Sequence, residues 1–147
     1  METEIHIHSH NLSIPFNPEH WKHLVQQMID EESLPASEIN IIFVDDPYLR
    51  DLHDRFLGDN TVTDVMTFNL GTEHHIEGEI YISVDRAKDQ AREFGVSLQE
   101  ELARLIIHGL LHLKGYDDAT PEEQRLMREK ENHYLEKFNL KGILPSG

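Results

Sequence analysis

Two histidines four residues apart, His108 and His112, are the part of this sequence whose types and spacing could do metal chemistry. They belong to the segment HGLLHLKGYDD, residues 108–118. On an α-helix, side chains four residues apart are separated by about 40° around the axis and about 6 Å along it, so two imidazoles can converge on one ion. Zinc proteases with the pattern H-E-x-x-H carry a glutamate directly after the first histidine, where this chain has Gly109. We therefore expect a metal site, without peptide hydrolysis by the mechanism of those proteases.

The spacing alone is a weak signal, because a chain with 11 histidines among 147 residues contains about 0.8 such pairs by chance. A second pair, His6 and His10, falls in a segment that alternates apolar and polar residues, which predicts a strand followed by a loop. The four-residue spacing has no helical meaning there. We interpret His6, His8 and His10 as exposed histidines.

The surroundings of the 108–112 pair make it more informative. It lies in the most apolar helical segment of the chain, where histidines are either metal-bound or hydrogen-bonded, because burying unpaired polar groups is costly. Gly109 costs about 1 kcal/mol of helix propensity relative to alanine, which indicates that a neighbouring element needs the space. Gly115 ends the helix and brings Asp117 and Asp118 near the imidazoles. Since the chain has no cysteine, histidine, aspartate and glutamate are the possible protein ligands.

The segments that must position this pair alternate between strand and helix signals. Strands are predicted at about 5–8, 38–44, 63–68 and 79–84, and helices at about 17–32, 47–56, 97–114 and 120–138, with helical structure from about residue 85 onward. This order predicts an α+β fold in a single domain, residues 1–147, with a mixed sheet of about four strands and helices packed against it. The metal site would lie on a helix and the following loop. We expect 71–78 to be a mobile loop and the tail from about residue 142 to be frayed.

Composition and charge limit the function further. With 38% hydrophobic and 28% charged residues, the chain is typical of a soluble globular protein. No apolar run approaches the roughly 20 residues that span a bilayer, and the N-terminus does not have the pattern of a signal peptide, so we expect a cytoplasmic location. The net charge of −15 argues against non-specific binding to nucleic-acid backbones. A local positive rim remains one interpretation, and ordinary exposed charges the other, for His74, His75, Arg86, Lys88 and Arg92.

At its full length, the 108–118 segment resembles the signature of the YbeY family of rRNA-maturation endoribonucleases, H-G-x-L-H-L-x-G-Y-D-H. Ten of the eleven positions fit, and the exception is Asp118, where the family usually has a third histidine. Residues 52–68 are similar to the family's L-N-x-x-[FY]-R-G-x-D-x-x-T-[DN]-V-L-S-F region, and residues 78–83 to its G-D-I-x-I-S strand. The resemblance covers the chain from about residue 35 to residue 135.

The resemblance implies a zinc ion bound by His108, His112 and Asp118. Aspartate is an acceptable zinc ligand, but its charge makes the site less positive by one unit. That change raises the pKa of bound water and weakens the preference for zinc over other divalent metals. In the alternative interpretation, Asp118 caps the corner between helix and loop, and Asp117 or water is the third ligand.

The implied activity is that of a zinc-dependent, single-strand-specific endoribonuclease. It would act in rRNA maturation, at the 3' end of the small-subunit rRNA, and in ribosome quality control. The implied partners are ribosomal RNA, proteins of the small ribosomal subunit and an assembly GTPase, with no membrane involved. An acidic chain can meet basic ribosomal proteins by charge complementarity, which would compensate for its weak attraction to RNA.

A second departure from the family concerns catalysis, because its R-G dipeptide corresponds here to Leu57 and Gly58. The family arginine is associated with RNA cleavage. Arg55 could replace it only in part, since a shift of two residues changes its direction on a helix, and an exposed helix arginine is the alternative. No general base is identified. Three carboxylates could orient the imidazoles or be ordinary carboxylates: Asp64, Glu79 and Glu101.

Two other functions compete with the endoribonuclease hypothesis. One is a ribosome-assembly binding factor in which the metal is structural and catalysis is vestigial, and Leu57 is its best support. The other is a metal hydrolase that acts on a different class of substrate, such as a protein.

Overall fold

The protein is described by a computed structural model that covers residues 2–58 and 63–141. Four strands and five helices follow one another within these residues. The strands are β1 (Glu4–Ser9), β2 (Ala36–Val44), β3 (Val65–Asn69) and β4 (Ile76–Ser83). The helices are α1 (Pro18–Glu32), α2 (Asp46–Leu57), α3 (Val84–Phe94), α4 (Leu98–Lys114) and α5 (Pro121–Lys137).

The strands form one mixed sheet in the order β1-β2-β4-β3. β1, β2 and β4 are parallel, with Ile41 of β2 opposite Ile7 on one side and Ile80 on the other. β3 runs antiparallel to β4 and forms one edge of the sheet. The predicted α+β fold with a four-stranded mixed sheet is therefore confirmed.

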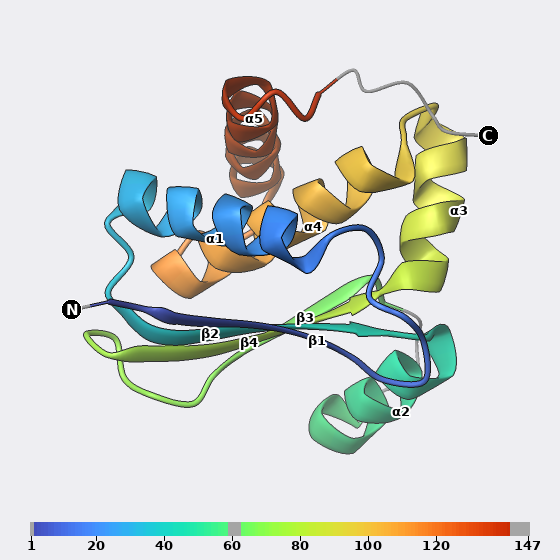
Figure 1. Cartoon of the computed structure of the whole chain (residues 1–147), viewed down its shortest axis with the longest axis horizontal. Coiled ribbons are helices and arrows are strands. Elements are labelled where there is room, and N and C mark those ends of the chain that lie inside the picture. The colour runs from blue at the N-terminus through green and yellow to red at the C-terminus, as the bar shows by residue number, and fades with distance from the viewer. Residues whose placement is uncertain (1, 59–62, 142–147) are drawn as a thin grey trace.

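Helices cover the two faces of the sheet unequally (Figure 1). α1 and α4 lie across one face, and the main core forms between them and alternate strand residues such as Ile39, Ile41 and Ile80. The opposite face is covered only near one end, where α2 contributes Leu49 to a small cluster with Val44 and Met66. α4 is thus the central helix, and the side chains that it carries are held in place by contacts with several neighbouring elements.

The sequence sets both ends of α4. The Ser97 side chain accepts a hydrogen bond from the Glu100 backbone amide (3.0 Å), which satisfies one of the free amides of the first turn. Gly115 ends the helix with φ of 116°, a left-handed conformation that favours glycine. This turn sends the chain back past the last turn of α4, so the loop that carries Asp118 lies beside His112.

Gly109 lets α4 approach the sheet closely. A Cβ atom placed on it would lie 2.8 Å from Cγ2 of Ile80, a fully buried side chain of β4. The expectation that a neighbouring element needs this space is confirmed. Because His108 and His112 flank the glycine, the contact also fixes how far both imidazoles stand from the sheet.

Several predicted boundaries differ from the structure. β4 begins at Ile76, so most of the predicted 71–78 loop is a tight connection between two paired strands. Backbone hydrogen bonds from Leu70 to Glu77 (2.8 Å) and from Thr72 to His75 (3.0 Å) hold it. The prediction placed the start of this strand too late because Gly78 stands inside β4, and glycine has a low strand propensity. The tail from residue 142, which we expect to be frayed, lies outside the described residues. In the part that is described, no helix is both long and apolar enough to cross a membrane.

Candidate metal centre

The structure brings the three predicted metal ligands together at the end of α4. The Nε2 atoms of His108 and His112 are 3.0 Å apart. The Oδ2 atom of Asp118, in the loop after Gly115, lies 3.3 Å from Nε2 of His108 and 3.5 Å from Nε2 of His112. Asp117 is exposed and is not part of this group. The geometry therefore favours Asp118 over Asp117 as the third member.

The spacing of these atoms fits a metal ion. Ligand atoms bound at about 2.0–2.2 Å from a tetrahedral zinc ion lie about 3.3–3.6 Å from one another. The separations of 3.0, 3.3 and 3.5 Å among the two imidazole nitrogens and the carboxylate oxygen are close to that range. Each of the three side chains is partly exposed, so an ion could enter from solvent.

Glu131, on α5, orients the His108 ring from behind. Nδ1 of His108 donates a hydrogen bond to Oε2 of Glu131 over 2.7 Å. In the neutral ring the proton is then on Nδ1, and the Nε2 atom carries a lone pair that faces Asp118. Two acceptors 3.3 Å apart repel each other unless a proton or a cation lies between them. Carboxylate–histidine pairs of this kind support the ligands of many metal sites.

The local charge also favours a cation at this point. Burial lowers the pKa of His108, but the hydrogen bond to Glu131 and the charges of Glu131, Asp118 and Asp64 outweigh it, so the pKa of the ring is raised. The same negative potential that stabilises a protonated imidazole stabilises a metal ion in contact with it.

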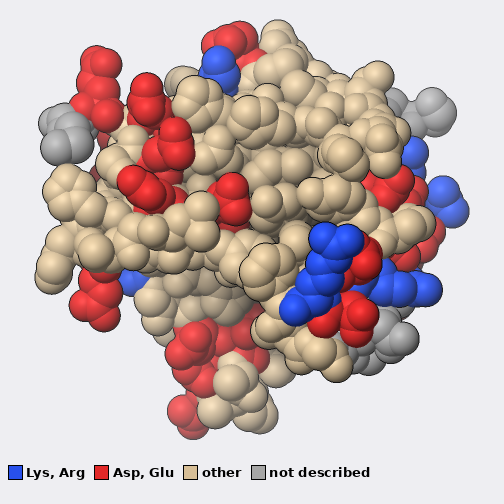
Figure 2. Space-filling view, turned by 90° about the horizontal axis from the view of Figure 1, so that it is seen from below, with Lys and Arg blue, Asp and Glu red and all other residues tan. Residues whose placement is uncertain are grey.

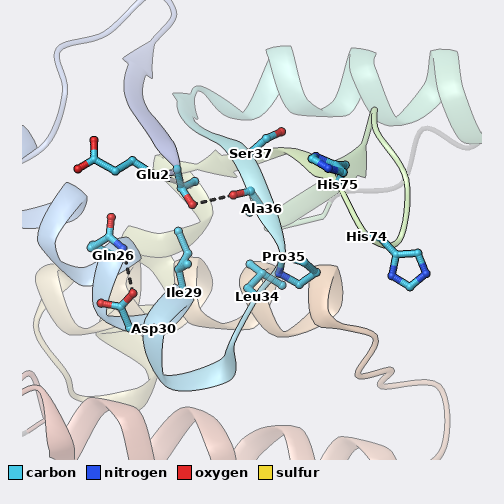
Figure 3. A pocket seen from close by; sticks show the side chains of 11 residues that line it. Glu2, Gln26, Ile29, Asp30, Leu34, Pro35, Ala36, Ser37, His74 and His75 are labelled. Atoms are coloured by element: carbon cyan, nitrogen blue, oxygen red, sulfur yellow. Dashed lines mark hydrogen bonds between the residues drawn. The ribbon is translucent and has the colours of Figure 1, made fainter.

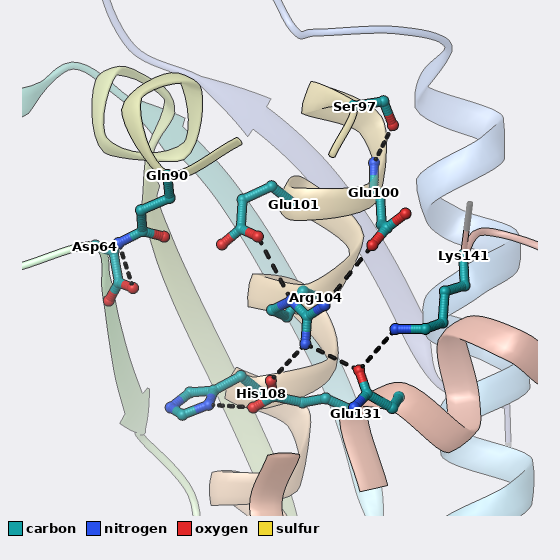
Figure 4. Close-up of polar contacts among 10 residues, drawn as sticks. Asp64, Gln90, Ser97, Glu100, Glu101, Arg104, His108, Glu131 and Lys141 are labelled. Carbon is teal, nitrogen blue, oxygen red and sulfur yellow. Dashed lines mark hydrogen bonds and ion pairs between the residues drawn. The ribbon is translucent and has the colours of Figure 1, made fainter. Parts of the chain in front are cut away.

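Arg104 connects Glu131 to two more carboxylates inside the protein (Figure 4). Its Nη1 donates to Oε1 of Glu131 (3.3 Å), and its guanidinium lies 3.7 Å from Glu100 and 3.4 Å from Glu101. Glu100, Glu101 and Glu131 are at most 4% exposed, and Arg104 is 9% exposed. We call these four residues the ionic wall. One guanidinium serves three acids, so the wall is negative overall.

Within the ionic wall, Glu101 is an acid whose pKa is shifted by its surroundings. Burial raises its pKa to about 7, and the nearby Asp64 and Glu131 charges add to this effect, whereas Arg104 and Arg128 oppose it. Its Oε1 atom is buried without a hydrogen-bond partner. Glu101 also lines a cavity of about 260 Å³ together with Asp64, His108 and Asp118.

A larger cavity, of about 610 Å³, opens on the same three ligands. Its walls come from α2, from the edge strand β3 and from the end of α4. The described residues that line it are His53, Leu57, Thr63, Asp64, Val65, Met66, Thr67, Phe68, Asn69, His108, His112, Leu113 and Asp118. None of them is a lysine or an arginine. The metal group therefore stands where a cleft without lysine or arginine in its described lining meets a buried, negatively charged wall.

The other predicted site residues separate into two groups. Asp64 lines both cavities and accepts a hydrogen bond from the Gln90 side chain (3.1 Å). Glu79 accepts from the Tyr81 hydroxyl (3.2 Å), and the structure does not bring it to the imidazoles. Arg55 forms an exposed ion pair with Asp51 (3.1 Å), as expected for an ordinary helix arginine. Asp64 and Glu101 thus stay candidates, and Glu79 and Arg55 do not.

The residues considered for a positive rim do not form one. Arg86 pairs with Asp46 (3.3 Å) and Arg92 with Asp89 (3.8 Å), so both charges are matched locally. His74 and His75 line a different cavity, of about 800 Å³, near the start of β2, where the His74 ring points away from the other labelled side chains (Figure 3). That cavity is larger than the one at the metal group, but its residues do not form a group of potential ligands among those described.

The histidines in β1 and directly after it are exposed, as predicted. His6, His8 and His10 are exposed, and His6 faces Glu38 at 3.6 Å. Glu4, His6 and Glu38 are also close enough to share an ion. Unlike the group on α4, this one is mostly exposed, and among the described residues no buried carboxylate supports its imidazole.

Glu131 is the functional residue that sequence reasoning missed. Met127, Glu131 and Tyr134 are all buried and share one face of α5. A glutamate in the middle of an apolar helix face requires a partner, because a buried charge is costly when unpaired. That signal was present in the sequence, but it could not say which group on another element would be the partner.

The chain matches the family model described as Endoribonuclease YbeY over residues 4–139. It belongs to the YbeY family. The Endoribonuclease YbeY of Flavobacterium psychrophilum is 41% identical over 117 residues, which are 80% of this chain and 84% of that protein. The Endoribonuclease YbeY of Christiangramia forsetii is 34% identical over 93% of this chain and 96% of that protein. The resemblance seen in three sequence segments is thus confirmed over nearly the whole YbeY domain.

A solved structure supports the fold in the same way. The solution structure of TM1509 from Thermotoga maritima is similar to this chain with a TM-score of 0.66 and 26% identity, and the match covers 94% of this chain and 93% of that one. The four-stranded sheet and its helices are therefore a known arrangement.

Proposed function

We propose that the protein is a metal-dependent endoribonuclease that cuts single-stranded ribosomal RNA in the cytoplasm, at the 3' end of the small-subunit rRNA. Membership of the YbeY family supports the reaction class. The observation that carries the proposal is the convergence of His108, His112 and Asp118 within 3.5 Å at the mouth of an open cavity.

In this proposal the three side chains hold one divalent cation. The cation supplies Lewis acidity toward a phosphate oxygen and makes water more acidic. Glu131 keeps the proton of His108 on Nδ1, so that Nε2 stays free to bind. We propose zinc as the resident metal, and the Asp118 carboxylate in place of an imidazole makes manganese or another harder divalent ion a competitor.

The cavity beside the metal group suits an extended substrate. Its volume of about 610 Å³ falls within the range of small-molecule sites, and it is open to solvent along β3. A metal that only stabilised the fold would be closed by four protein ligands. Among the described residues the group has three potential ligands, so the geometry favours catalysis over the structural-metal alternative.

Charge supports a role for partners in bringing RNA to this site. Figure 2 views the face of the sheet opposite α1 and α4; acidic side chains are spread over it, and lysines and arginines gather mainly toward the right of the view. With a net charge of −15, the protein is repelled by bare RNA. We propose that basic proteins of the small ribosomal subunit, and an assembly GTPase, help to position it.

The proposal is tested by metal analysis combined with RNA cleavage. Purified protein should carry about one divalent ion and cut an unstructured RNA, and His112→Ala should lose the ion and at least about 1,000-fold of the rate, since the ligand set is broken. His133→Ala, an exposed histidine on α5, is the matched control and should keep both. Cleavage that persists in His112→Ala at the wild-type rate would show that a contaminating nuclease or another site is responsible.

A further inference from the structure

The outer wall of the larger cavity carries apolar side chains that face solvent. Phe56 and Leu57, at the end of α2, are both 64% exposed. Leu57 lines the cavity with the three metal ligands, and so does Phe68 of β3, whose ring lies 5.2 Å from the Phe56 ring. We call Phe56, Leu57 and Phe68 the apolar rim. Large exposed apolar groups next to a functional cavity indicate a binding surface.

The apolar rim has no cation to attract a phosphate. The described lining of the cavity contains no lysine or arginine. Arg55 precedes Phe56 on α2, but it does not line the cavity and pairs with Asp51 (3.1 Å). Arg104 and Arg128 line the smaller cavity, and Arg104 is already occupied by three carboxylates. Because backbone affinity for nucleic acids comes from such charges, a strand on this side must be held by another force.

Aromatic rings at this wall continue from the rim into the molecule. Phe68 packs edge-on against Tyr81 (5.9 Å), and Tyr81 stacks with Tyr48 (6.4 Å). Phe68 is therefore held in place, and it supports Phe56 from one side, while most of Phe56 remains exposed. An aromatic face that is fixed but accessible is what a nucleobase stacks on, and this contact does not depend on base identity.

The edge strand β3 adds uncharged hydrogen-bonding groups. All five of its residues line the cavity, and β4 is its only strand partner in the described part of the chain. Its second edge can offer backbone amides and carbonyls to a base or a ribose. The Asn69 side chain is not available for this, because it already accepts hydrogen bonds from Gly71 and Glu77 and donates to Thr72.

We propose that the apolar rim is a stacking site for an unpaired nucleobase next to the cleaved phosphate, so that bases, and not backbone charges, supply the affinity on this side. This inference rests on the proposed endoribonuclease function and deepens it. It also gives a physical reason for single-strand specificity, because a base in a duplex is already stacked and cannot lie on Phe56.

The first test uses the metal-loaded protein and a short unstructured RNA. Phe56→Ala is expected to weaken binding about 5- to 150-fold, the effect of one stacked base, and to raise KM more than it lowers kcat. Phe56→Trp should restore binding, and its fluorescence should be quenched when the RNA is added. Leu126→Ala removes an apolar, 47% exposed side chain of α5 that lines neither cavity, and should change nothing.

The second test compares the RNA with a strand of the same length that lacks bases. Binding of the abasic strand should be at least about 5-fold weaker, and log affinity for the RNA should fall with log salt with a slope of about −0.7 or less in magnitude, as for one neutralised phosphate. Equal binding of both strands, or wild-type affinity in Phe56→Ala, would overturn the stacking site. An extended apolar peptide that displaces the RNA from Phe56→Trp at lower concentration would instead identify a peptide-binding edge. If wild-type protein loaded with metal binds RNA through its bases but does not cut it, the proposed function fails and the stacking site stands.

Discussion

The two walls that meet at the metal group differ in nearly every physical property. The ionic wall behind His108 is buried and charged, and each of its members is at most 9% exposed. The apolar rim in front of the same ligands is uncharged, and two of its three residues, Phe56 and Leu57, are 64% exposed. Both walls lie within reach of one pair of imidazoles.

This difference shows that orienting a metal-binding side chain and binding a flexible substrate need different surroundings. A metal-binding imidazole needs one fixed orientation, and buried charged hydrogen bonds supply it because they are strong and directional where water is excluded. A flexible strand needs a surface that accepts many sequences, and exposed apolar groups supply it without directional demands. The protein builds the ionic wall from α4 and α5 and the apolar rim from α2 and β3.

The largest effect is expected from breaking the ionic wall. Glu131→Ala removes a carboxylate that binds both His108 and Arg104, so we expect metal affinity to fall about 10- to 100-fold. The free energy of unfolding should fall by about 1.5–3 kcal/mol, because charged hydrogen bonds are lost while Arg104 keeps Glu100 and Glu101 as partners. Chelator competition and urea unfolding measure the two effects. Glu129→Ala, an exposed glutamate on the same helix, is the control. Unchanged metal affinity in Glu131→Ala would mean that the wall does not support the ligand.

Measuring stability against pH sharpens the comparison of the two walls, because the ionic wall contains an acid with a strongly shifted pKa and the apolar rim contains no acid. Burial raises the pKa of Glu101 from 4.5 to about 7, against the effect of Arg104 and Arg128 and with that of Asp64 and Glu131. Between these values the folded protein binds more protons than the unfolded chain, so its stability falls as pH rises and levels off above about 7.

Because of the raised pKa of Glu101, the free energy of unfolding should fall by on the order of 3 kcal/mol as pH rises through this range. In metal-free protein, Glu101→Gln should remove most of the decline in unfolding free energy between pH 4.5 and pH 7, measured by urea unfolding at each pH. The exposed Glu129→Gln should follow the wild-type curve. A Glu101→Gln curve that keeps the full wild-type slope would show that another group titrates in this range.

The smallest effect is expected from adding a cation to the apolar rim. Leu57→Arg places a guanidinium at the position that corresponds to the arginine of the R-G dipeptide in the family pattern. We expect kcat/KM for RNA to rise about 10-fold, as one charged hydrogen bond to phosphate allows. The slope of log RNA affinity against log salt concentration should become steeper by about 0.7. Leu126→Arg on α5 adds the same charge elsewhere and controls for net charge. Lower activity in Leu57→Arg would mean that the rim is adapted to work without the cation.

Much of the fold and the three candidate ligands could be predicted from sequence. The element order followed from alternation in the strands and from apolar periodicity in the helices, both of which are local. His108, His112 and Asp118 lie within eleven residues, on one helix end and one turn. Helix spacing and the turn at Gly115 were therefore enough to bring Asp117 and Asp118 near the two imidazoles, and the resemblance to the YbeY family pointed to Asp118. The β3–β4 connection was extended too far because a glycine stands inside β4.

The surroundings of these ligands were decided by tertiary structure. Glu131 comes from 23 residues away on another helix, and its contact with His108 exists only because α5 packs against α4. The apolar rim depends on α2 meeting the edge strand β3. Local periodicity says which face of an element is apolar, but not which face of another element it meets. For this reason the sequence determined what could bind a metal, and the packing of distant elements decided which groups support that site and which surface a substrate would meet.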